Sequence, residues 1–415
     1  MQSSKSGNWI FAIPSFWGLA TWTVAVAAYL FGGIGWEPVN HTALALLLMM
    51  PACFLFSLLI FSSVIRSVFN NHYDRLFPKV NLRWEFLLHG LGVVSSLMVV
   101  YSVTHSGWIE GDFFTTMIND PIAIRTATSK NPPVGIYVGY AGWIGAFISG
   151  AQAGMYKKGR WIHYLLLSIQ VVASLVFLSK IRPIAIILLF AFPYLILNYR
   201  RFSPLRLAIL CATLMIVIVG FFVIWSDSTG KVYSLDLGYP PAIETFLLYL
   251  TSGPAYFSHV VAIEIPDMNL SRTLRPFYAL SAILFDTEPP PPSIIPFYSI
   301  PITTNVGTAL EPWFRDYGIA GVLVGVFVVS FGVDLIAYWG LKFGRVSGTM
   351  VAIVMCFCST LAFFVPRLTS GAVLGALLIF FLHFVIVTIR QLASPNTQTM
   401  PHIAPNALSA DEAPS

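Results

Sequence analysis

The sequence predicts an all-α, polytopic integral membrane protein, and three observations support this fold class. First, 57% of the 415 residues are hydrophobic and only 10% are charged, whereas about a quarter of the residues in a soluble domain are charged. Second, the apolar residues occur in long unbroken runs of roughly the 20 residues that a bilayer requires. Third, lysine and arginine concentrate in alternate connections between these runs, as expected for a chain that crosses a membrane repeatedly.

The apolar runs predict about ten transmembrane helices. The first run is too long for a signal-peptide core and further runs follow it directly, so we expect an uncleaved helix. A single transmembrane domain is expected over residues 1–393, followed by a disordered cytoplasmic tail over 394–415 that is rich in Pro, Ser, Asn and Ala. The predicted spans are 9–32, 42–65, 86–104, 134–154, 161–179, 183–199, 205–225, 317–340, 347–366 and 371–389.

The basic residues predict that both termini face the cytoplasm. With the N-terminus inside, the inner segments hold 14 of the 23 basic residues and five of the 18 acidic ones, and the outer segments hold the rest. The inner loops thus account for the net charge of +5, and nothing indicates a nucleic-acid partner. All four cysteines fall within predicted spans, so no disulfide framework is expected. No zinc spacing, phosphate loop or dinucleotide turn is present, and we expect neither a metal nor a cofactor.

One large outer loop, residues 227 to about 315, lies between the seventh and eighth helices. Loops of this length are usually functional. Its segment "PAIETFLLYLTSGPAYFSHVVAIEI" is nearly long enough to span, but "FYALSAILF" is too short to bring the chain back. We therefore expect a pair of helices in the outer interface, with Pro254 marking a break.

Cations stand just before the helices that run from outside to inside. Both the helix dipole and the positive-inside rule disfavour them at this place, so we expect each charge to add little to stability. An anionic ligand would remove the contradiction, because helix N-termini and guanidinium groups bind phosphate well. Phospholipid headgroups, or salt bridges to acids such as Asp316 and Glu311, would satisfy individual arginines instead. The residues are Lys130 before the fourth helix, Lys180 and Arg182 before the sixth, Arg315 before the eighth and Arg367 before the tenth, with Arg272 and Arg275 in the large loop.

Two other polar residues near these cations are candidates for the site. His259, on the expected interfacial helix, could act as a general base, although an amphipathic helix would also turn such a ring toward water. Asp316 is well placed to cap the eighth helix through its side chain.

Two short patterns stand at the end of the large loop: N-x-x-T at Asn305 and Thr308, and D-Y-G-x-x-G at Asp316, Tyr317, Gly318 and Gly321. They resemble the patterns of the O-antigen polymerases (Wzy type), a family of oligosaccharide repeat unit polymerases. The segment "FLSKIRP" at 177–183 is similar in place to a short arginine-bearing loop of that family, with Lys180 where a glycine often stands. The layout, with many spans and one large outer loop in the second half, is also similar.

The resemblance implies a metal-independent glycosyltransferase of the bacterial inner membrane whose active site faces the periplasm. Such enzymes transfer the growing chain from undecaprenyl diphosphate onto an incoming undecaprenyl-diphosphate-linked repeat unit, and a chain-length regulator is a further expected partner. We expect His259, Arg182 and Arg315 to be catalytic. We expect the diphosphate to be bound by Lys180, Arg182, Arg272, Arg275, Arg315 and Arg367.

Two alternatives stay open. An O-antigen ligase would use similar arginines on the same lipid diphosphate but would transfer the chain to a lipid A core. A flippase for lipid-linked sugars would bind the same anion without forming a bond. A flippase should place cations along a path between helices, and the predicted spans contain almost none, which favours an enzyme.

Overall fold

The chain forms a helical bundle with one two-stranded hairpin. The computed structural model describes residues 9–77, 81–107, 111–120, 135–156, 158–177, 181–198, 235–291, 296–300 and 302–365, with shorter pieces between and after them. The elements are η1 (Trp9–Ala12), α1 (Pro14–Phe31), α2 (His41–Leu76), α3 (Leu82–His105), α4 (Phe113–Asn119), α6 (Gly135–Val138), α7 (Tyr140–Met155), α8 (Arg160–Ser174), η2 (Leu175–Phe177), α9 (Ile181–Asn198), α11 (Pro241–Ile263), α12 (Arg275–Phe285), β1 (Tyr298–Ser299), β2 (Thr303–Thr304), α13 (Glu311–Phe327), η4 (Val328–Gly332), α14 (Val333–Lys342) and α15 (Val346–Thr360).

Within these residues, five helices are long and apolar enough to cross a membrane: His41–Phe69, Leu82–His105, Arg160–Phe177, Ile243–Ile263 and Glu311–Lys342. Several of them expose large apolar side chains, such as Phe56 and Leu59 on α2 and Leu97 on α3. A soluble monomer rarely exposes continuous apolar faces, so lipid is the expected surrounding. The predicted span 205–225 lies almost entirely outside the described residues, and of the predicted span 371–389 only short helical pieces are described.

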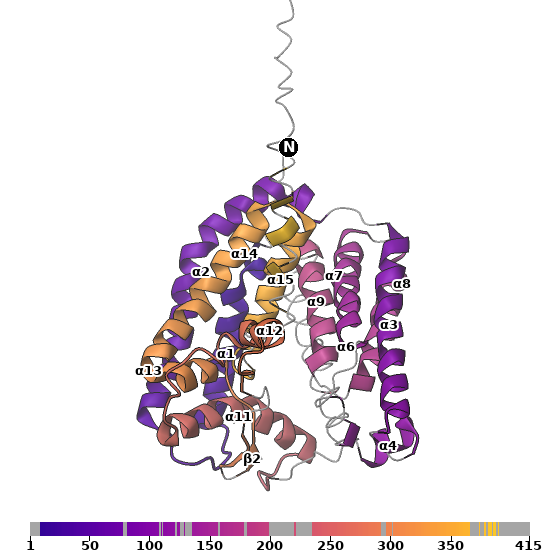
Figure 1. Cartoon of the computed structure of the whole chain (residues 1–415). Helices are drawn as coiled ribbons and strands as arrows, with labels where there is room; N and C mark the ends of the chain where they lie inside the picture. The colour runs from indigo at the N-terminus through magenta and orange to yellow at the C-terminus, as the bar shows by residue number, and fades with distance from the viewer. Residues whose placement is uncertain are drawn as a thin grey trace, which may run out of the picture.

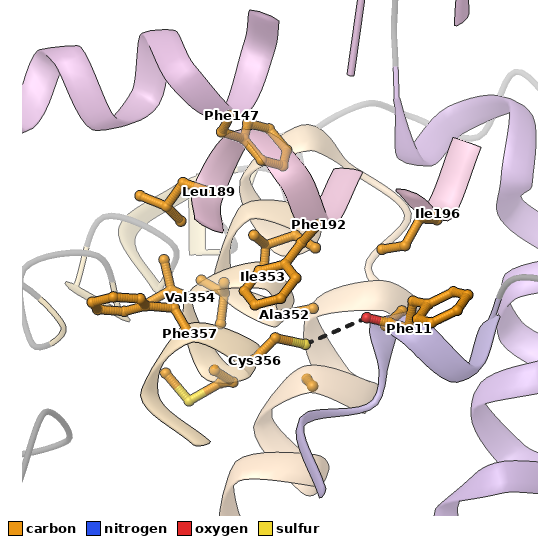
Figure 2. Packing of buried hydrophobic residues seen from close by; sticks show 14 of the residues in the cluster. Phe11, Phe147, Leu189, Phe192, Ile196, Ala352, Ile353, Val354, Cys356 and Phe357 are labelled. Atoms are coloured by element: carbon orange, nitrogen blue, oxygen red, sulfur yellow. Dashed lines mark hydrogen bonds between the residues drawn. The ribbon is translucent and has the colours of Figure 1, made fainter. Parts of the chain in front are cut away.

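The helices form two groups (Figure 1). One group contains α1, α2, α11, α13, α14 and α15, and the other contains α3, α6, α7, α8 and α9. The groups meet where α15 packs against α9. Figure 2 shows the apolar core of this junction, in which Phe192 of α9 lies beside Ile353 of α15. Phe147 of α7 and Phe357 of α15 belong to the same cluster. The Cys356 thiol points to the Phe11 carbonyl oxygen at 3.8 Å, so the cysteine packs in the core.

Side-chain caps fix the beginnings of two long helices. Asn40 accepts a hydrogen bond from the Ala43 N–H at 3.1 Å, and Asn81 accepts one from the Arg83 N–H at 3.0 Å. Each satisfies a backbone donor that has no partner inside its helix. The caps place the starts of α2 and α3 within a few residues of the predicted spans.

The large loop differs from the prediction at Pro254. The helix α11 runs without interruption from Pro241 to Ile263 and includes Pro254, so the expected break there was wrong. The helix pair consists of α11 and α12, and the chain turns between them over residues 264–274. Figure 1 shows α11 lying across one end of the bundle, while α2, α3 and α13 run along it. The hairpin of β1 and β2 follows α12, with Tyr298 paired to Thr304.

Candidate functional site

Arg315 lies before the apolar part of α13, in a short helical segment that begins at Glu311. This segment ends at Tyr317 and Gly318, where the backbone leaves the helical conformation. Gly318 has φ 61° and ψ −144°, a combination that only glycine adopts readily. Arg315 therefore lies on a separate helical turn, and the apolar part of α13 begins after this kink.

The guanidinium of Arg315 is surrounded by protein groups. Its Nη1 lies 2.7 Å from Glu264 Oε2, and its Nε lies against Glu311 Oε1. Its Nη2 donates to the Tyr256 hydroxyl at 3.0 Å. Arg315 is only 5% exposed, so no edge of the guanidinium is left for a diphosphate. For Arg315 the salt-bridge alternative holds, with Glu311 and Glu264 as partners in place of Asp316.

The same carboxylates tie α11, the hairpin and α13 together. The Tyr298 hydroxyl donates to Glu264 Oε1 at 2.6 Å, and the Tyr256 hydroxyl donates to the Pro296 carbonyl oxygen at 2.8 Å. The hydrogen bond to Glu264, together with burial, raises the pKa of the Tyr298 phenol, which keeps it a neutral donor. We call Tyr256, Glu264, Tyr298, Glu311 and Arg315 the Arg315 cluster.

Asp316 organises the loop between α11 and α12. Its carboxylate accepts hydrogen bonds from the backbone N–H groups of Thr273 at 2.7 Å and Arg272 at 3.2 Å. The neighbouring Arg315 carbonyl oxygen accepts a further bond from the Asp267 N–H at 2.6 Å. The predicted N-cap of the eighth helix was therefore wrong, because both Asp316 oxygens point to a segment more than 40 residues earlier in the chain.

The two loop arginines have protein partners as well. Arg272 Nε lies 3.1 Å from Asp267 Oδ2, on a partly exposed pair. Arg275 Nε donates to the Pro291 carbonyl oxygen at 3.0 Å, and burial lowers the pKa of Arg275. Neither guanidinium contacts the Arg315 side chain through a hydrogen bond in the described part of the chain.

The N-x-x-T pattern lies in the loop before α13. Thr308 is fully buried, and its Oγ1 accepts a hydrogen bond from the Leu310 N–H at 3.2 Å. The Ala309 N–H donates to the Ala362 carbonyl oxygen at 2.7 Å, so this loop is fixed to the end of α15. Asn305 is half-buried at the start of the loop. Gly321 permits close packing inside the kink, since a Cβ there would lie 2.1 Å from the Trp313 carbonyl oxygen.

His259 pairs with a carboxylate that the sequence analysis did not single out. Its Nδ1 lies 2.8 Å from Glu37 Oε2, in the connection between α1 and α2. The imidazole also packs on Tyr298, with ring centroids 4.8 Å apart, so it adjoins the Arg315 cluster. The pair borders a small pocket lined by Tyr29, Trp36, Glu37, Ser258, His259 and Ile300.

This arrangement suits proton transfer. A carboxylate on Nδ1 fixes the orientation of the ring and stabilises the imidazolium form, while Nε2 is left to exchange a proton. No hydrogen bond to His259 Nε2 is found within the described residues. Glu37 was missed because it is 222 positions from His259 and no local pattern links them.

Arg182 has a different environment in the other helical group. It lies in the first turn of α9, and both terminal nitrogens are 3.4 Å from the Ile136 carbonyl oxygen. The guanidinium carbon is 4.0 Å from the centroid of the Phe177 ring and 5.7 Å from that of Tyr140. Among the described residues it forms no ion pair, so its charge is balanced only by a carbonyl dipole and two aromatic faces.

The structure thus brings some of the predicted residues together and separates others. His259, Arg272, Arg315 and Asp316 gather where α11, the 264–274 turn and α13 meet, whereas Arg182 belongs to the group of α7 and α9. Lys130, Lys180 and Arg367 lie outside the described residues. Over the described part of the chain, no group of three or more His, Cys, Asp and Glu side chains is arranged to hold a metal ion.

Comparison with known proteins gives no relative from which a role could be taken. No family model, no curated protein and no solved structure matches the chain.

Proposed function

We propose that the protein is a glycosyltransferase that polymerises lipid-linked oligosaccharide repeat units at the outer face of a bacterial inner membrane. The donor would be the growing chain on undecaprenyl diphosphate, and the acceptor an incoming repeat unit on the same carrier. The observation that carries this proposal is the His259–Glu37 pair, which borders a pocket beside the Arg315 cluster. The segment that resembles the O-antigen polymerases supplies part of that cluster.

The proposed step is a substitution at the anomeric carbon of the donor. His259 Nε2 takes the proton of the acceptor hydroxyl, and the hydroxyl oxygen forms the new bond to that carbon. The bond from the carbon to the diphosphate oxygen breaks, and the diphosphate leaves with the electron pair. Glu37 stabilises the imidazolium that results.

The leaving diphosphate needs cations near it. Arg182 fits this role best among the described arginines, because it forms no ion pair there and stays half-buried at a helix start. The predicted roles of Lys180 and Arg367 are retained in the proposal. Arg315 is assigned a positioning role, since its guanidinium holds two carboxylates and, through Glu264, the tyrosine against which His259 packs.

The experiment that tests this proposal uses the purified full-length protein in vesicles with lipid-linked repeat units alone. We expect elongation without added metal or nucleotide sugar. His259→Ala should lower the rate by about 10²–10⁴-fold, the usual contribution of a general base, and Glu37→Gln should lower it by a smaller factor. His105→Ala is the matched control, because His105 is an exposed histidine that stacks on Tyr101.

The outcomes separate the alternatives. Product that forms only when a lipid A core is supplied would identify a ligase. Transfer of the intact lipid-linked unit across the vesicle membrane without elongation would identify a flippase. Unchanged elongation in His259→Ala would remove His259 from the mechanism.

A further inference from the structure

A set of polar side chains is buried between α3, α7 and α8, away from the site described above. Each is at most 8% exposed, although these helices otherwise carry apolar residues. Two of the helices, α3 and α8, are long and apolar enough to cross a membrane. Polar and ionisable groups in such a place are costly and commonly functional. We call this set the polar column; it consists of Glu85 and His89 of α3, Ser149 of α7, and His163 and Gln170 of α8.

Four members of the polar column form one continuous chain of contacts. His163 Nδ1 lies 2.6 Å from Glu85 Oε1, and the Ser149 hydroxyl donates to the same carboxylate oxygen. The Ser149 oxygen is also 2.8 Å from His89 Nε2. Glu85 and His89 are four residues apart, so His89 lies about 6 Å further along α3. The serine hydroxyl can donate to either neighbour because it rotates freely.

Glycines provide the space for these side chains. A Cβ on Gly92 would lie 2.3 Å from Gln170 Oε1, and one on Gly142 would lie 2.4 Å from Gln170 Nε2. Alanine at either position would force the amide out of the helix interface. At the far end, a Cβ on Gly139 would meet both Ser95 Oγ at 2.9 Å and Arg182 Nη1 at 3.1 Å. Polar atoms therefore continue from His163 toward Arg182.

The charges in the polar column do not balance unless a proton is shared. An ionised carboxylate in a medium of low polarity must be neutralised. Within the described residues, the groups that contact the Glu85 carboxylate are Ser149 on α7 and His163 on α8, and His89 follows one turn further along α3. Neither lysine nor arginine is among them. A proton held between Glu85 and His163 makes the set neutral as a whole.

Three buried atoms of the polar column have no hydrogen-bond partner in the described part of the chain: Glu85 Oε2, His89 Nδ1 and Gln170 Oε1. The Glu85 oxygen is the one that can carry a negative charge. Leaving a buried carboxylate oxygen unpaired is costly when the group is ionised. The cost falls when that oxygen carries a proton, because the carboxyl group is then neutral.

We propose that Glu85, His163, Ser149 and His89 form an intramembrane proton-binding site. One proton is held between Glu85 and His163, and on acidification a second proton binds from the aqueous phase on the side of His163. It binds at the Glu85 carboxylate, while His163 keeps its own proton. The proton rests on Glu85, and Ser149 links this carboxyl group to His89, because its oxygen lies against Glu85 Oε1 and 2.8 Å from His89 Nε2. This proposal does not depend on the transferase activity.

The test is an infrared difference spectrum of the full-length protein in lipid, taken between mildly alkaline and mildly acidic pH. We expect a carbonyl band of a protonated carboxylic acid to appear on acidification and to be missing in Glu85→Gln. In His163→Gln the same band should already be present at alkaline pH, because the carboxylate has lost its counter-ion. No band, or an unchanged band in Glu85→Gln, would overturn the proposal.

Asp334 provides the control, because it is a second buried carboxyl group in the other helical group. It accepts hydrogen bonds from the Ser57 hydroxyl at 2.6 Å and from the Ser15 N–H at 3.0 Å. Asp334→Asn should leave the Glu85 band in place, and loss of the band in this variant would assign it to Asp334 and overturn the proposal. If Glu85→Gln does not fold, two other variants test the proposal. In His163→Gln, the carbonyl band must already be present at alkaline pH. In Ser149→Ala with isotope-labelled histidine, the titration of the His89 ring nitrogens must differ from that in the native protein.

Discussion

Arg182 and Arg315 were predicted to be equivalent residues at outward helix starts, and their surroundings are opposite. Arg315 is held by two carboxylates and a tyrosine hydroxyl. Arg182 contacts one carbonyl oxygen and two aromatic rings, and it forms no ion pair within the described residues. Arg315 is buried and Arg182 is half-buried, so neither is fully exposed, and exposure alone does not identify an anion site. The partners decide whether a buried cation is structural or is available to a ligand.

The comparison also changes one of two expectations about stability. The charges of Arg182 and Arg315 were both expected to contribute little to the stability of the fold, and this no longer holds for Arg315. That expectation used only the helix dipole, which is worth about 0.3–1 kcal/mol at a helix end. Around Arg315 the effect of the two carboxylates is larger, because removing one partner of a buried ion pair leaves an uncompensated charge. For Arg182 no carboxylate is left behind, so the original expectation is kept.

The largest effect is expected for Arg315→Gln. This change leaves the buried Glu311 and the half-buried Glu264 without their cation. It should reduce the free energy of unfolding by about 3–5 kcal/mol. Denaturant titration of the purified protein in detergent measures the loss, with the exposed Arg345→Gln as control. The added change Glu311→Gln should recover part of it. Unaltered stability in Arg315→Gln would contradict the structural role of Arg315, and the two arginines would then no longer differ in this respect.

Arg182→Ala tests the other half of the comparison. We expect stability within about 1 kcal/mol of the native protein, because a cation over aromatic rings contributes on this order. Elongation should fall roughly tenfold to a hundredfold, since a charge-assisted contact to the leaving group is worth about 1.5–3 kcal/mol. Arg182→Lys should restore part of the rate, because lysine keeps the charge but not the planar donor geometry.

The measurement for Arg182 is polysaccharide chain length beside membrane protein level, with Arg345→Ala as control. Normal chains in Arg182→Ala would remove this arginine from the site. Short chains that follow entirely from lost protein would show that Arg182, like Arg315, is structural.

A smaller effect is expected for Tyr256→Phe. The phenol accepts from Arg315 and donates to the Pro296 carbonyl oxygen, so its removal affects two hydrogen bonds and no ion pair. We expect a loss of about 1.5–3 kcal/mol in the free energy of unfolding, below that of Arg315→Gln. Tyr239→Phe is the control, because Tyr239 is 55% exposed. An effect as large as that of Arg315→Gln would show that the tyrosine, and not the carboxylates, dominates the cluster.

The polar column in the other helical group also shows that the partners of a charged residue cannot be predicted from the local sequence. Glu85 was counted in sequence as an ordinary acid of the inner segment, and His89 and His163 were not singled out. In the structure these three lie within one network with Ser149. Glu85 and His89 lie four residues apart on α3, but their partners come from α7 and α8.

The class of the protein and the location of most described helices could be predicted from local sequence patterns. Long apolar runs and asparagine caps act over a few neighbouring residues, so α2, α3, α8 and α13 could be read from the chain directly. Gly318 could be recognised as special from its pattern, although not as a kink. The number of spans and the orientation stay predictions, and the break at Pro254 failed because a helix in close tertiary packing can include a proline.

The partners of the charged groups could not be predicted from the sequence, because they depend on how distant helices pack. Glu37 meets His259 across 222 positions, and Asp316 binds backbone groups 43 and 44 positions earlier. Such pairs depend on which helix faces which, and hydropathy carries no information about that choice. A buried charge is strongly stabilised or strongly destabilised by a single neighbouring group, because a medium of low polarity screens it little. Arg182 and Arg315 therefore have different roles because their packing partners differ. The local sequence around each arginine does not reveal these partners.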